Sequence, residues 1–408
     1  MESKWWSRLR WTQWLTSVGD GMFYVVSAAL LLRLGFSAGR VGVVLSLVWG
    51  VAMVATPMVG RLADRVGLRA GVLGLPVVVA AGLCVVAAGA NAAWTSAGLL
   101  VYAVGQAALG GVRQALVIPL ALGTGRSATT ERATLQAIGN AGIAVGAVLG
   151  GAALATGSLV ALRGALVLDA GLFLASVAVL RALPTLPHAD RALSAAAGRP
   201  GIRYLALTVC AGLMYLYMPL LSVGLPLVIG TRDDVPDWVI AALFGLNTLG
   251  VLALQRRVAR RVTSLDLARR YARRGAALMA SCCLLFWASL SAVDWPWLLA
   301  GMVLAVGVQV VAEVIFASGA WDLGYRLAPA AAAGTWQGTF AAAVPASRCV
   351  GPALLSWLLV SGGLLGFAVL ALLFLVAGLG MSILATPTRL AEAPTYTPVD
   401  RRMAPELP

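Results

Sequence analysis

The chain contains the stretch Gly60-Arg61-Leu62-Ala63-Asp64-Arg65-Val66-Gly67-Leu68-Arg69 between two strongly apolar runs, residues 41–60 and 71–91. The two glycines permit positive φ and close backbone approach, so the stretch predicts a very tight turn. Asp64 can cap a helix N-terminus or pair with a nearby arginine. Each flanking run is long enough to cross a bilayer core of about 30 Å, which needs about 20 apolar residues.

The composition of the whole chain indicates a membrane protein. Hydrophobic residues make up 60% of the 408 residues and charged residues 11%, and the mean hydropathy is +0.90. Soluble globular proteins average roughly 45 to 50% apolar and about 25% charged residues. The net charge of +14 is spread through short gaps between apolar runs, so it indicates membrane topology and no nucleic-acid partner.

The apolar runs predict an all-α membrane protein with twelve transmembrane helices. The first run is too long for a cleavable signal, so it is expected to stay in the mature protein. The predicted spans are residues 11–33, 41–60, 71–91, 95–122, 133–156, 160–182, 203–229, 237–255, 275–293, 297–319, 335–359 and 363–386.

The positions of lysine and arginine predict the orientation. Every second gap between spans, counted with the two ends of the chain, is basic, and these gaps together hold 24 of the 30 Lys and Arg residues. By the positive-inside rule, both termini lie in the cytoplasm, and the alternation agrees with an even number of spans.

A polar interruption divides the spans six and six. It covers residues 183–202 and contains Pro184, Pro187 and Pro200. A weak internal repeat supports the division, because Thr134-Leu135-Gln136-Ala137 corresponds to Thr335-Trp336-Gln337-Gly338 at an offset of about half the chain. The prediction is two pseudo-symmetric six-helix bundles, residues 1–182 and 203–386, joined by a cytoplasmic linker at 183–202 and followed by a disordered cytoplasmic tail at 387–408.

The stretch at 60–69 resembles the G-x-L-A-D-R-x-G-R-[RK] signature of the major facilitator superfamily. The matches are Gly60, Leu62, Ala63, Asp64, Arg65, Gly67 and the basic Arg69, whereas Leu68 departs from the usual basic residue. The resemblance implies that this gating loop, in particular Gly60, Asp64, Arg65, Gly67 and Arg69, stabilises one of two alternating states. The alternative is a tight basic turn that only obeys the positive-inside rule.

Other stretches are similar to the twelve-span drug:proton antiporters. In the span at 133–156, Gly142, Gly146, Gly150 and Gly151 resemble the antiporter pattern g-x-x-x-G-P-x-x-G-G, with Ala147 in place of the proline. Ordinary helix packing through small residues explains the same glycines. Glu313, and Asn247 with Gln255, also occur in an order similar to multidrug-type facilitators, although Ala333 stands where that family usually has arginine.

Ionisable residues inside the spans are the candidate functional groups, because burying a charge in a membrane is costly. Asp20 lies about ten residues into the first span, near the midplane, between Gly19 and Gly21. It could change protonation as a cavity alternates between wet and closed, or form a permanent ion pair. Glu313 suits coupling, cation binding or a structural hydrogen bond. Asp169 is a third candidate, with Arg163 as a plausible partner.

Arg113 and Arg348 are the natural counter-charges within the spans. Arg348 could instead bind an anionic group of a substrate. The sole histidine, His188, falls in the linker, where a solvated side chain is expected. The five cysteines lie inside apolar runs, as packing residues do. No nucleotide-binding loop, metal cluster, or nucleophile with a base appears in the sequence, so no catalytic or metal site is expected and the chain is not expected to be an enzyme.

The resemblance and the buried charges together favour a secondary transporter that exports a small amphipathic or hydrophobic molecule in exchange for protons, with the proton gradient in place of a cofactor. We expect a monomer in the plasma (inner) membrane whose partners are the substrate, protons and lipid. One alternative is a proton-coupled or facilitated importer of a small metabolite. Another is a receptor or scaffold on the same fold that transports nothing.

Overall fold

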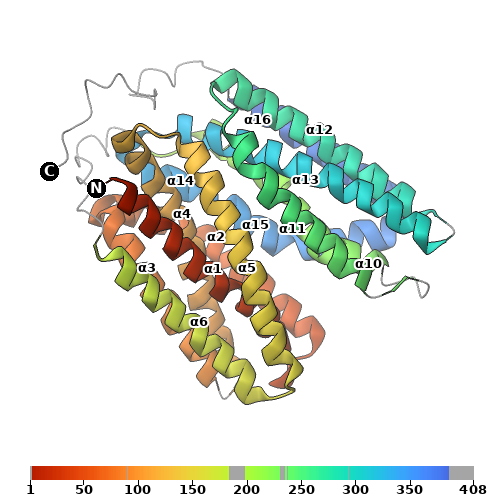
Figure 1. The fold of residues 1–408 in the computed structure, drawn as a ribbon, viewed down its shortest axis with the longest axis horizontal. Helices are drawn as coiled ribbons and strands as arrows, with labels where there is room; N and C mark the ends of the chain where they lie inside the picture. The colour runs from red at the N-terminus through yellow and green to blue at the C-terminus, as the bar shows by residue number, and fades with distance from the viewer. Residues whose placement is uncertain are drawn as a thin grey trace. The chain divides into compact units, whose positions relative to one another are not determined.

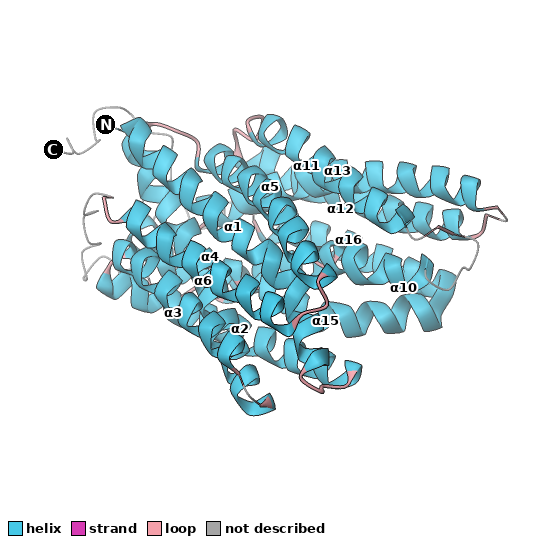
Figure 2. Ribbon diagram, turned by 60° about the horizontal axis from the view of Figure 1, so that its bottom comes forward, coloured by secondary structure: helices cyan, strands magenta, loops and turns pink. Residues whose placement is uncertain are grey.

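The computed structural model describes residues 2–89, 91–182, 198–229, 235–236, 238–292 and 294–385. Every regular element in these ranges is a helix (Figure 2). Most of the predicted linker, including His188, and the predicted tail lie outside the described residues.

The N-terminal half contributes six long helices, one at each of the first six predicted spans; the first begins nine residues before its predicted span, and the others begin within five residues of theirs. They are α1 (Glu2–Arg33), α2 (Ala38–Val66), α3 (Leu68–Ala88), α4 (Ala92–Thr124), α5 (Ala128–Ala155) and α6 (Leu159–Leu180). Polar residues set several of their ends: Ser37, Asn91 and Ser127 each cap a helix N-terminus by accepting a backbone N–H.

The helices of the C-terminal half are interrupted more often than those of the N-terminal half. Its elements are α8 (Ile202–Met214), α9 (Tyr217–Pro219), the π-helix η1 (Leu220–Gly224), α10 (Leu225–Ile229), α11 (Trp238–Ala259), α12 (Leu265–Leu290), α13 (Trp295–Arg326), the 3-10 helix η2 (Ala330–Ala332), α14 (Ala333–Ala341), α15 (Ala343–Leu355), the π-helix η3 (Ser356–Ser361) and α16 (Gly362–Leu384). The predicted spans at 203–229 and 335–359 are therefore interrupted helices, as proline-containing membrane helices often are.

Ten stretches of the described chain are long and apolar enough to cross a membrane. The last of them, Ala330–Leu384, holds two passages, because Gly363 has φ of +50° and interrupts the helix there. The 26-residue helix α12 supplies the remaining predicted span; four arginines in its first turns lower its mean hydropathy. These segments match the twelve predicted spans.

Contacts within the chain define two compact units. The first contains Met1–Arg199 and also Ala328–Pro345, so that α14 belongs with the N-terminal helices. The second contains Pro200–Leu327 and the chain from Ala346 through α16. This grouping differs from the predicted domains at residues 328–345, because α14 packs on α2 and α4.

In the first unit, α1 packs against α5 and α6, and α3 packs against α4 and α6 (Figure 1). In the second unit, α12 packs between α13 and α16, and α13 also contacts α11. Both cores are filled by large apolar side chains, such as Phe173 in the first unit and Phe374 in the second, neither of which is exposed.

The stretch at 60–69 is helical almost throughout, which corrects the prediction of a loop. Helix α2 continues to Val66, and α3 starts at Leu68. The chain reverses at Gly67 alone, whose φ of 98° is a conformation that favours glycine and whose N–H donates to the carbonyl of Ala63. Asp64 and Arg65 therefore lie in the last turn of a helix, which gives their side chains a defined direction.

Candidate functional site

Asp20 is the centre of a buried polar cluster on α1. Its side chain is 6% exposed and accepts hydrogen bonds of 3.0 Å from the hydroxyl of Tyr102 and 3.0 Å from the amide of Gln106, both on α4. Phe23 stacks on the Tyr102 ring and shields this side of the cluster. A charged carboxylate so deep in a span is stabilised by these two donors.

Arg113 on α4 reaches the same face of α1. Its guanidinium donates to Gln13 at 2.5 Å and to Thr16 at 3.3 Å. Thr16 lies four residues and Gln13 seven residues before Asp20, so the three side chains share one face of the helix. Arg113 was predicted as a counter-charge for a buried acid; in this structure it is linked to Asp20 through the polar face of α1 and by its electrostatic interaction with Asp20.

Asp169 on α6 is fully buried and packs against the residue before Asp20. A Cβ added to Gly19 would overlap the carboxylate of Asp169, so Asp169 occupies the space that glycine leaves on α1. Among the described residues, neither carboxylate oxygen of Asp169 has a hydrogen-bond partner. The predicted partner Arg163 donates instead to the carbonyl of Gly89 at 2.9 Å, which corrects that expectation.

Two acids thus lie close together within one unit under unequal conditions. Asp20 has donors that suit a carboxylate anion, whereas Asp169 has none, and an anion without donors or counter-charges is strongly disfavoured in a dry interior. Their charges also interact with each other. Protonation of either acid would relieve the repulsion between two neighbouring anions.

In the second unit, Glu313 is the half-buried acid of α13. The amide of Asn247 on α11 donates to it at 3.3 Å, and Tyr217 of α9 hydrogen-bonds it as well. Tyr217 lies where the helix is interrupted before η1, so the break brings a hydroxyl to the acid. Arg348 is half-buried on α15 of the same unit.

Asp64 caps the N-terminus of α14. Its carboxylate accepts the backbone N–H of Gly334 at 2.7 Å and both the N–H and the hydroxyl of Thr335, at 2.7 and 2.6 Å. An anion at this position meets unpaired N–H groups and the positive end of the helix dipole. Of the two roles predicted for Asp64, helix capping is the one observed among the described residues.

Close backbone contact brings α14 to that carboxylate. A Cβ on Gly60 would overlap the carbonyl of Gly334, and a Cβ on Gly338 would lie 3.0 Å from the carbonyl of Thr56. The two arginines of the signature have other surroundings. Arg65 is exposed, and Arg69 donates to the carbonyl of Arg181 at 2.9 Å. The glycines therefore set the distance between α2 and α14.

The glycine stripe of α5 packs on α1. A Cβ on Gly146 would overlap the carbonyl of Val18, and Cβ atoms on Gly142 and Gly150 would lie 2.9 and 3.1 Å from Ser17 and Met22. Gly151 lies outside this contact, since no atom is found within 4 Å of a Cβ built there. Three of the four predicted glycines thus hold α5 against the helix that carries Asp20.

Sequence reasoning missed Tyr102 and Gln106. With Arg113 they follow a spacing of i, i+4 and i+11, which places all three on one face of α4. That spacing is a usable signal for the Asp20 cluster.

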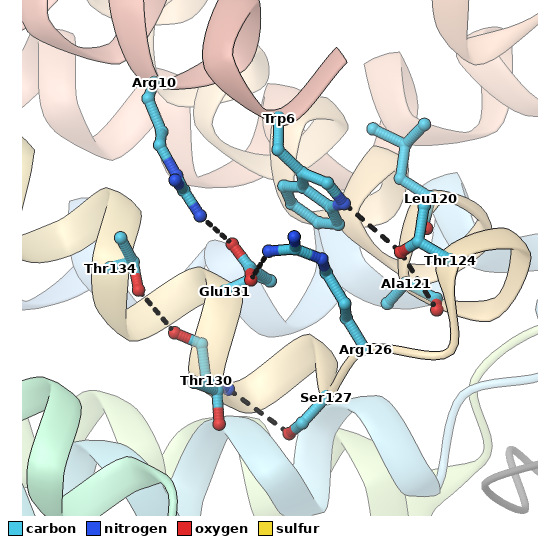
Figure 3. A network of polar contacts seen from close by, with 10 residues as sticks. All are labelled: Trp6, Arg10, Leu120, Ala121, Thr124, Arg126, Ser127, Thr130, Glu131 and Thr134. Carbon is cyan, nitrogen blue, oxygen red and sulfur yellow. Dashed lines mark hydrogen bonds and ion pairs between the residues drawn. The ribbon is translucent and has the colours of Figure 1, made fainter. Parts of the chain in front are cut away.

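Sequence reasoning also missed Glu131 on α5, whose side chain is 6% exposed. Its two carboxylate oxygens form ion pairs of 2.8 Å with Arg10 and 2.8 Å with Arg126 (Figure 3). Trp6 donates to Thr124 at 3.2 Å beside this bridge. The network joins the start of α1 to the turn between α4 and α5.

Comparisons with known proteins agree on one architecture. A sequence profile described as Major Facilitator Superfamily matches residues 11–352. The human organic anion transporter MFSD10 (TETRAN) has a similar structure, with a TM-score of 0.70 and 18% identity over 93% of this chain and 99% of that chain.

Two further solved structures are similar. An outward-facing bacterial homologue of the iron transporter ferroportin has a TM-score of 0.67 and 15% identity, covering 93% of this chain and 98% of its own. The E. coli fucose:proton symporter FucP has a TM-score of 0.65 and 14% identity, covering 94% and 98%. A comparison with curated protein sequences finds no significant match. The profile and the shared fold confirm the predicted all-helical, multi-span membrane architecture.

Proposed function

This chain belongs to the major facilitator superfamily, whose members are secondary transporters and not enzymes, and within that family we propose that it exports a small amphipathic or hydrophobic molecule in exchange for protons. Inward movement of one charge through about 100 mV supplies roughly 2.3 kcal/mol before any pH difference is added. The proposal needs a group that gains and loses a proton, a device that favours one of two states, and a substrate.

The observation that carries the proposal is the pair of buried acids, Asp20 and Asp169. Their unequal surroundings support a site that keeps one proton when it is closed and dry. Water that enters an open site stabilises both anions, so the proton leaves on the side to which the site opens. Proton binding then biases the two states differently, which is the requirement for coupling.

The contact of Asp64 with α14 supports a switch. In the first unit the carboxylate caps the start of an interrupted helix whose continuation belongs to the second unit from Ala346 onward. A charge-assisted cap of this kind stabilises the state in which it forms and is lost when α14 moves away. We assign this role to Asp64, with Gly60 and Gly67 positioning it and with Arg65 and Arg69 as the basic residues of the same signature.

Export and substrate class rest on the similarity of the α5 glycine stripe to the antiporter pattern. Glu313 and Arg348 are the charged candidates for substrate or proton binding in the second unit. We further propose two six-helix bundles as the moving parts, a monomer, the plasma membrane as location, and both termini in the cytoplasm, as the distribution of arginine indicates.

Proton-coupled import is the second candidate function. It is favoured by the similarity to FucP, described as a fucose:proton symporter, and by Ala147, which stands where the antiporter pattern has proline. A scaffold that transports nothing is the third candidate, and it leaves the cost of the buried acids unexplained.

Reconstituted vesicles separate the three. The purified chain is placed in vesicles that contain a pH-sensitive dye, a pH difference of either sign is imposed, and a panel of amphipathic compounds and small metabolites is tested. Exchange predicts that substrate and protons move in opposite directions, whereas symport predicts movement in the same direction. Absence of substrate-dependent proton movement over the whole panel, with correctly folded protein, contradicts both.

A further inference from the structure

The segment that ends α11 and begins α12 concentrates positive charge. It contains eight of the chain's arginines and one acidic residue, Asp266; the arginines are Arg256, Arg257, Arg260, Arg261, Arg269, Arg270, Arg273 and Arg274. No other gap between spans comes near this density. A connection that only obeys the positive-inside rule does not need so many charges.

The two helices turn these arginines outward. On α11 and the turn after it, Ala259 and Val262 are buried, while the arginines at positions 256, 257, 260 and 261 are exposed. On α12, Ala268, Ala272 and Gly275 face the core, while the arginines at 270, 273 and 274 lie on the opposite, exposed face at a spacing of i, i+3 and i+4. The outward direction is thus set by the buried side of each helix.

The seven exposed arginines have no protein partner in the described part of the chain, where neither a hydrogen bond nor an ion pair reaches their side chains. The acidic residue of the segment, Asp266, forms an ion pair of 3.2 Å with the half-buried Arg269 and with none of the seven exposed arginines. Arg326 provides a contrast, because it bonds Asp322 at 2.5 Å and the carbonyl of Thr263 at 3.1 Å and so fastens the turn to α13. The turn is anchored, while none of the described residues neutralises its outer charges.

The depth of these groups follows from helix geometry. The apolar part of α11 ends at Leu254 and that of α12 begins at Gly275, so the seven arginines lie within seven residues of an apolar run. At 1.5 Å per residue this is roughly 10 Å or less, and the polar headgroup layer on each side of a bilayer is about 5 to 8 Å thick. Flexible arginine side chains can therefore place their guanidinium groups at the level of lipid phosphates.

We propose that this arginine patch, the seven exposed arginines of residues 256–274, binds the headgroups of anionic phospholipids. A guanidinium group makes paired hydrogen bonds to phosphate oxygens, and a lipid with net negative charge leaves that phosphate uncompensated, whereas a choline headgroup neutralises it internally. Clusters of four to eight basic residues next to a membrane span are a known form of such a site. The site is separate from the Asp20 cluster and does not depend on proton coupling.

The test measures lipid binding directly. The full chain, purified in detergent, is exchanged into bilayer discs of phosphatidylcholine with increasing phosphatidylglycerol, and the phosphatidylglycerol retained per protein is counted by native mass spectrometry. We expect preferential retention of phosphatidylglycerol. A triple variant should bind phosphatidylglycerol more weakly, by about five-fold for each arginine and on the order of a hundred-fold in all. Its substitutions are Arg270→Gln, Arg273→Gln and Arg274→Gln.

Two control variants distinguish an effect of the arginine patch from an effect of the net charge of the protein. Arg40, Arg61 and Arg181→Gln removes the same number of exposed arginines elsewhere and should retain the lipid preference. Arg270, Arg273 and Arg274→Lys keeps the charge and should retain most of it. Thermal unfolding of each variant confirms that loss of lipid is not loss of fold.

Four outcomes overturn the proposal. The first is equal retention of phosphatidylglycerol and phosphatidylcholine by the unaltered chain, and the second is equal losses in the α12 variant and in the variant of Arg40, Arg61 and Arg181. The third is the same affinity for soluble glycerol phosphate as for the lipid, which assigns the patch to a free phosphate compound. Binding of an acidic peptide that phosphatidylglycerol does not displace assigns it to a protein partner and also contradicts the lipid proposal.

Discussion

The carboxylate of Asp64 receives three hydrogen bonds from α14, two of them from Thr335, a residue 271 positions later in the chain. An acid at the end of one helix thereby stabilises the start of another. Both glycine contacts that flank it, at Gly60 and Gly334, leave space for no side chain. A small change at Asp64 or Thr335 is therefore expected to weaken the packing of α14 on α2.

Asp64→Asn is expected to weaken transport while expression stays normal. The amide keeps an acceptor but loses the charge that interacts with the helix dipole, and a lost cap costs about 1 kcal/mol. Substrate accumulation per unit of membrane protein checks this. Thr335→Val, which removes one of the three bonds, should have a smaller effect in the same direction, and Asp64→Asn with undiminished transport contradicts the switch.

Asp20→Asn is expected to weaken the dependence of transport on an imposed pH difference, because only one acid of the pair, Asp169, can then still exchange a proton. Substrate exchange without a gradient should persist, since the amide still occupies the site of the carboxylate. Dye-reported proton movement in vesicles is the measurement, with Asp266→Asn, an exposed acid, as the control. Unchanged proton movement in Asp20→Asn assigns coupling to another residue.

Asp169→Ala is expected to stabilise the fold while it impairs coupling. The substitution removes a fully buried carboxyl group that lacks a hydrogen-bond partner among the described residues, and such a group costs about 1 to 3 kcal/mol. The matched change Asp20→Ala should destabilise, because it leaves the Tyr102 hydroxyl and the Gln106 amide without an acceptor. Thermal unfolding in detergent compares the two variants. A loss of stability in Asp169→Ala contradicts the inference that the Asp169 carboxyl group destabilises the fold.

Glu131→Gln is expected to reduce stability by on the order of 1 to 3 kcal/mol, because two arginines lose a buried counter-charge. Partial exposure of both arginines, 33% and 43%, places the effect below that of a fully buried pair. A double-mutant cycle with Arg10→Gln measures the coupling. Asp266→Asn, which breaks an exposed pair, should cost less than about 0.5 kcal/mol.

Gly146→Ala and Gly151→Ala form a matched pair on one helix. At Gly146 the new methyl group overlaps the carbonyl of Val18 and must push α1 and α5 apart, at a cost of about 1 to 3 kcal/mol. At Gly151 it meets open space, so the better helix propensity of alanine should stabilise by up to about 1 kcal/mol. Opposite shifts in unfolding temperature are expected; equal shifts contradict the α1–α5 contact.

The local arrangement of the spans followed from the amino acids alone. A bilayer core of about 30 Å demands about 20 apolar residues from each crossing, so hydropathy located the helices without knowledge of their neighbours. The signature at 60–69 is equally local, since Gly67 permits the positive φ on which the turn depends. Its helical geometry was missed, because charged residues at a helix end and in a loop look alike in a sequence.

Only the tertiary structure decided which buried polar groups meet. The sequence suggests Arg163, on the same helix, as the partner of Asp169. In the structure Asp169 lies against Gly19, and Arg163 donates a hydrogen bond to the carbonyl of Gly89. Each helix advances by about 100° per residue, so contacts depend on its rotation about its axis. In a membrane both the lipid-facing and the protein-facing sides are apolar, and hydropathy therefore carries little information about that rotation.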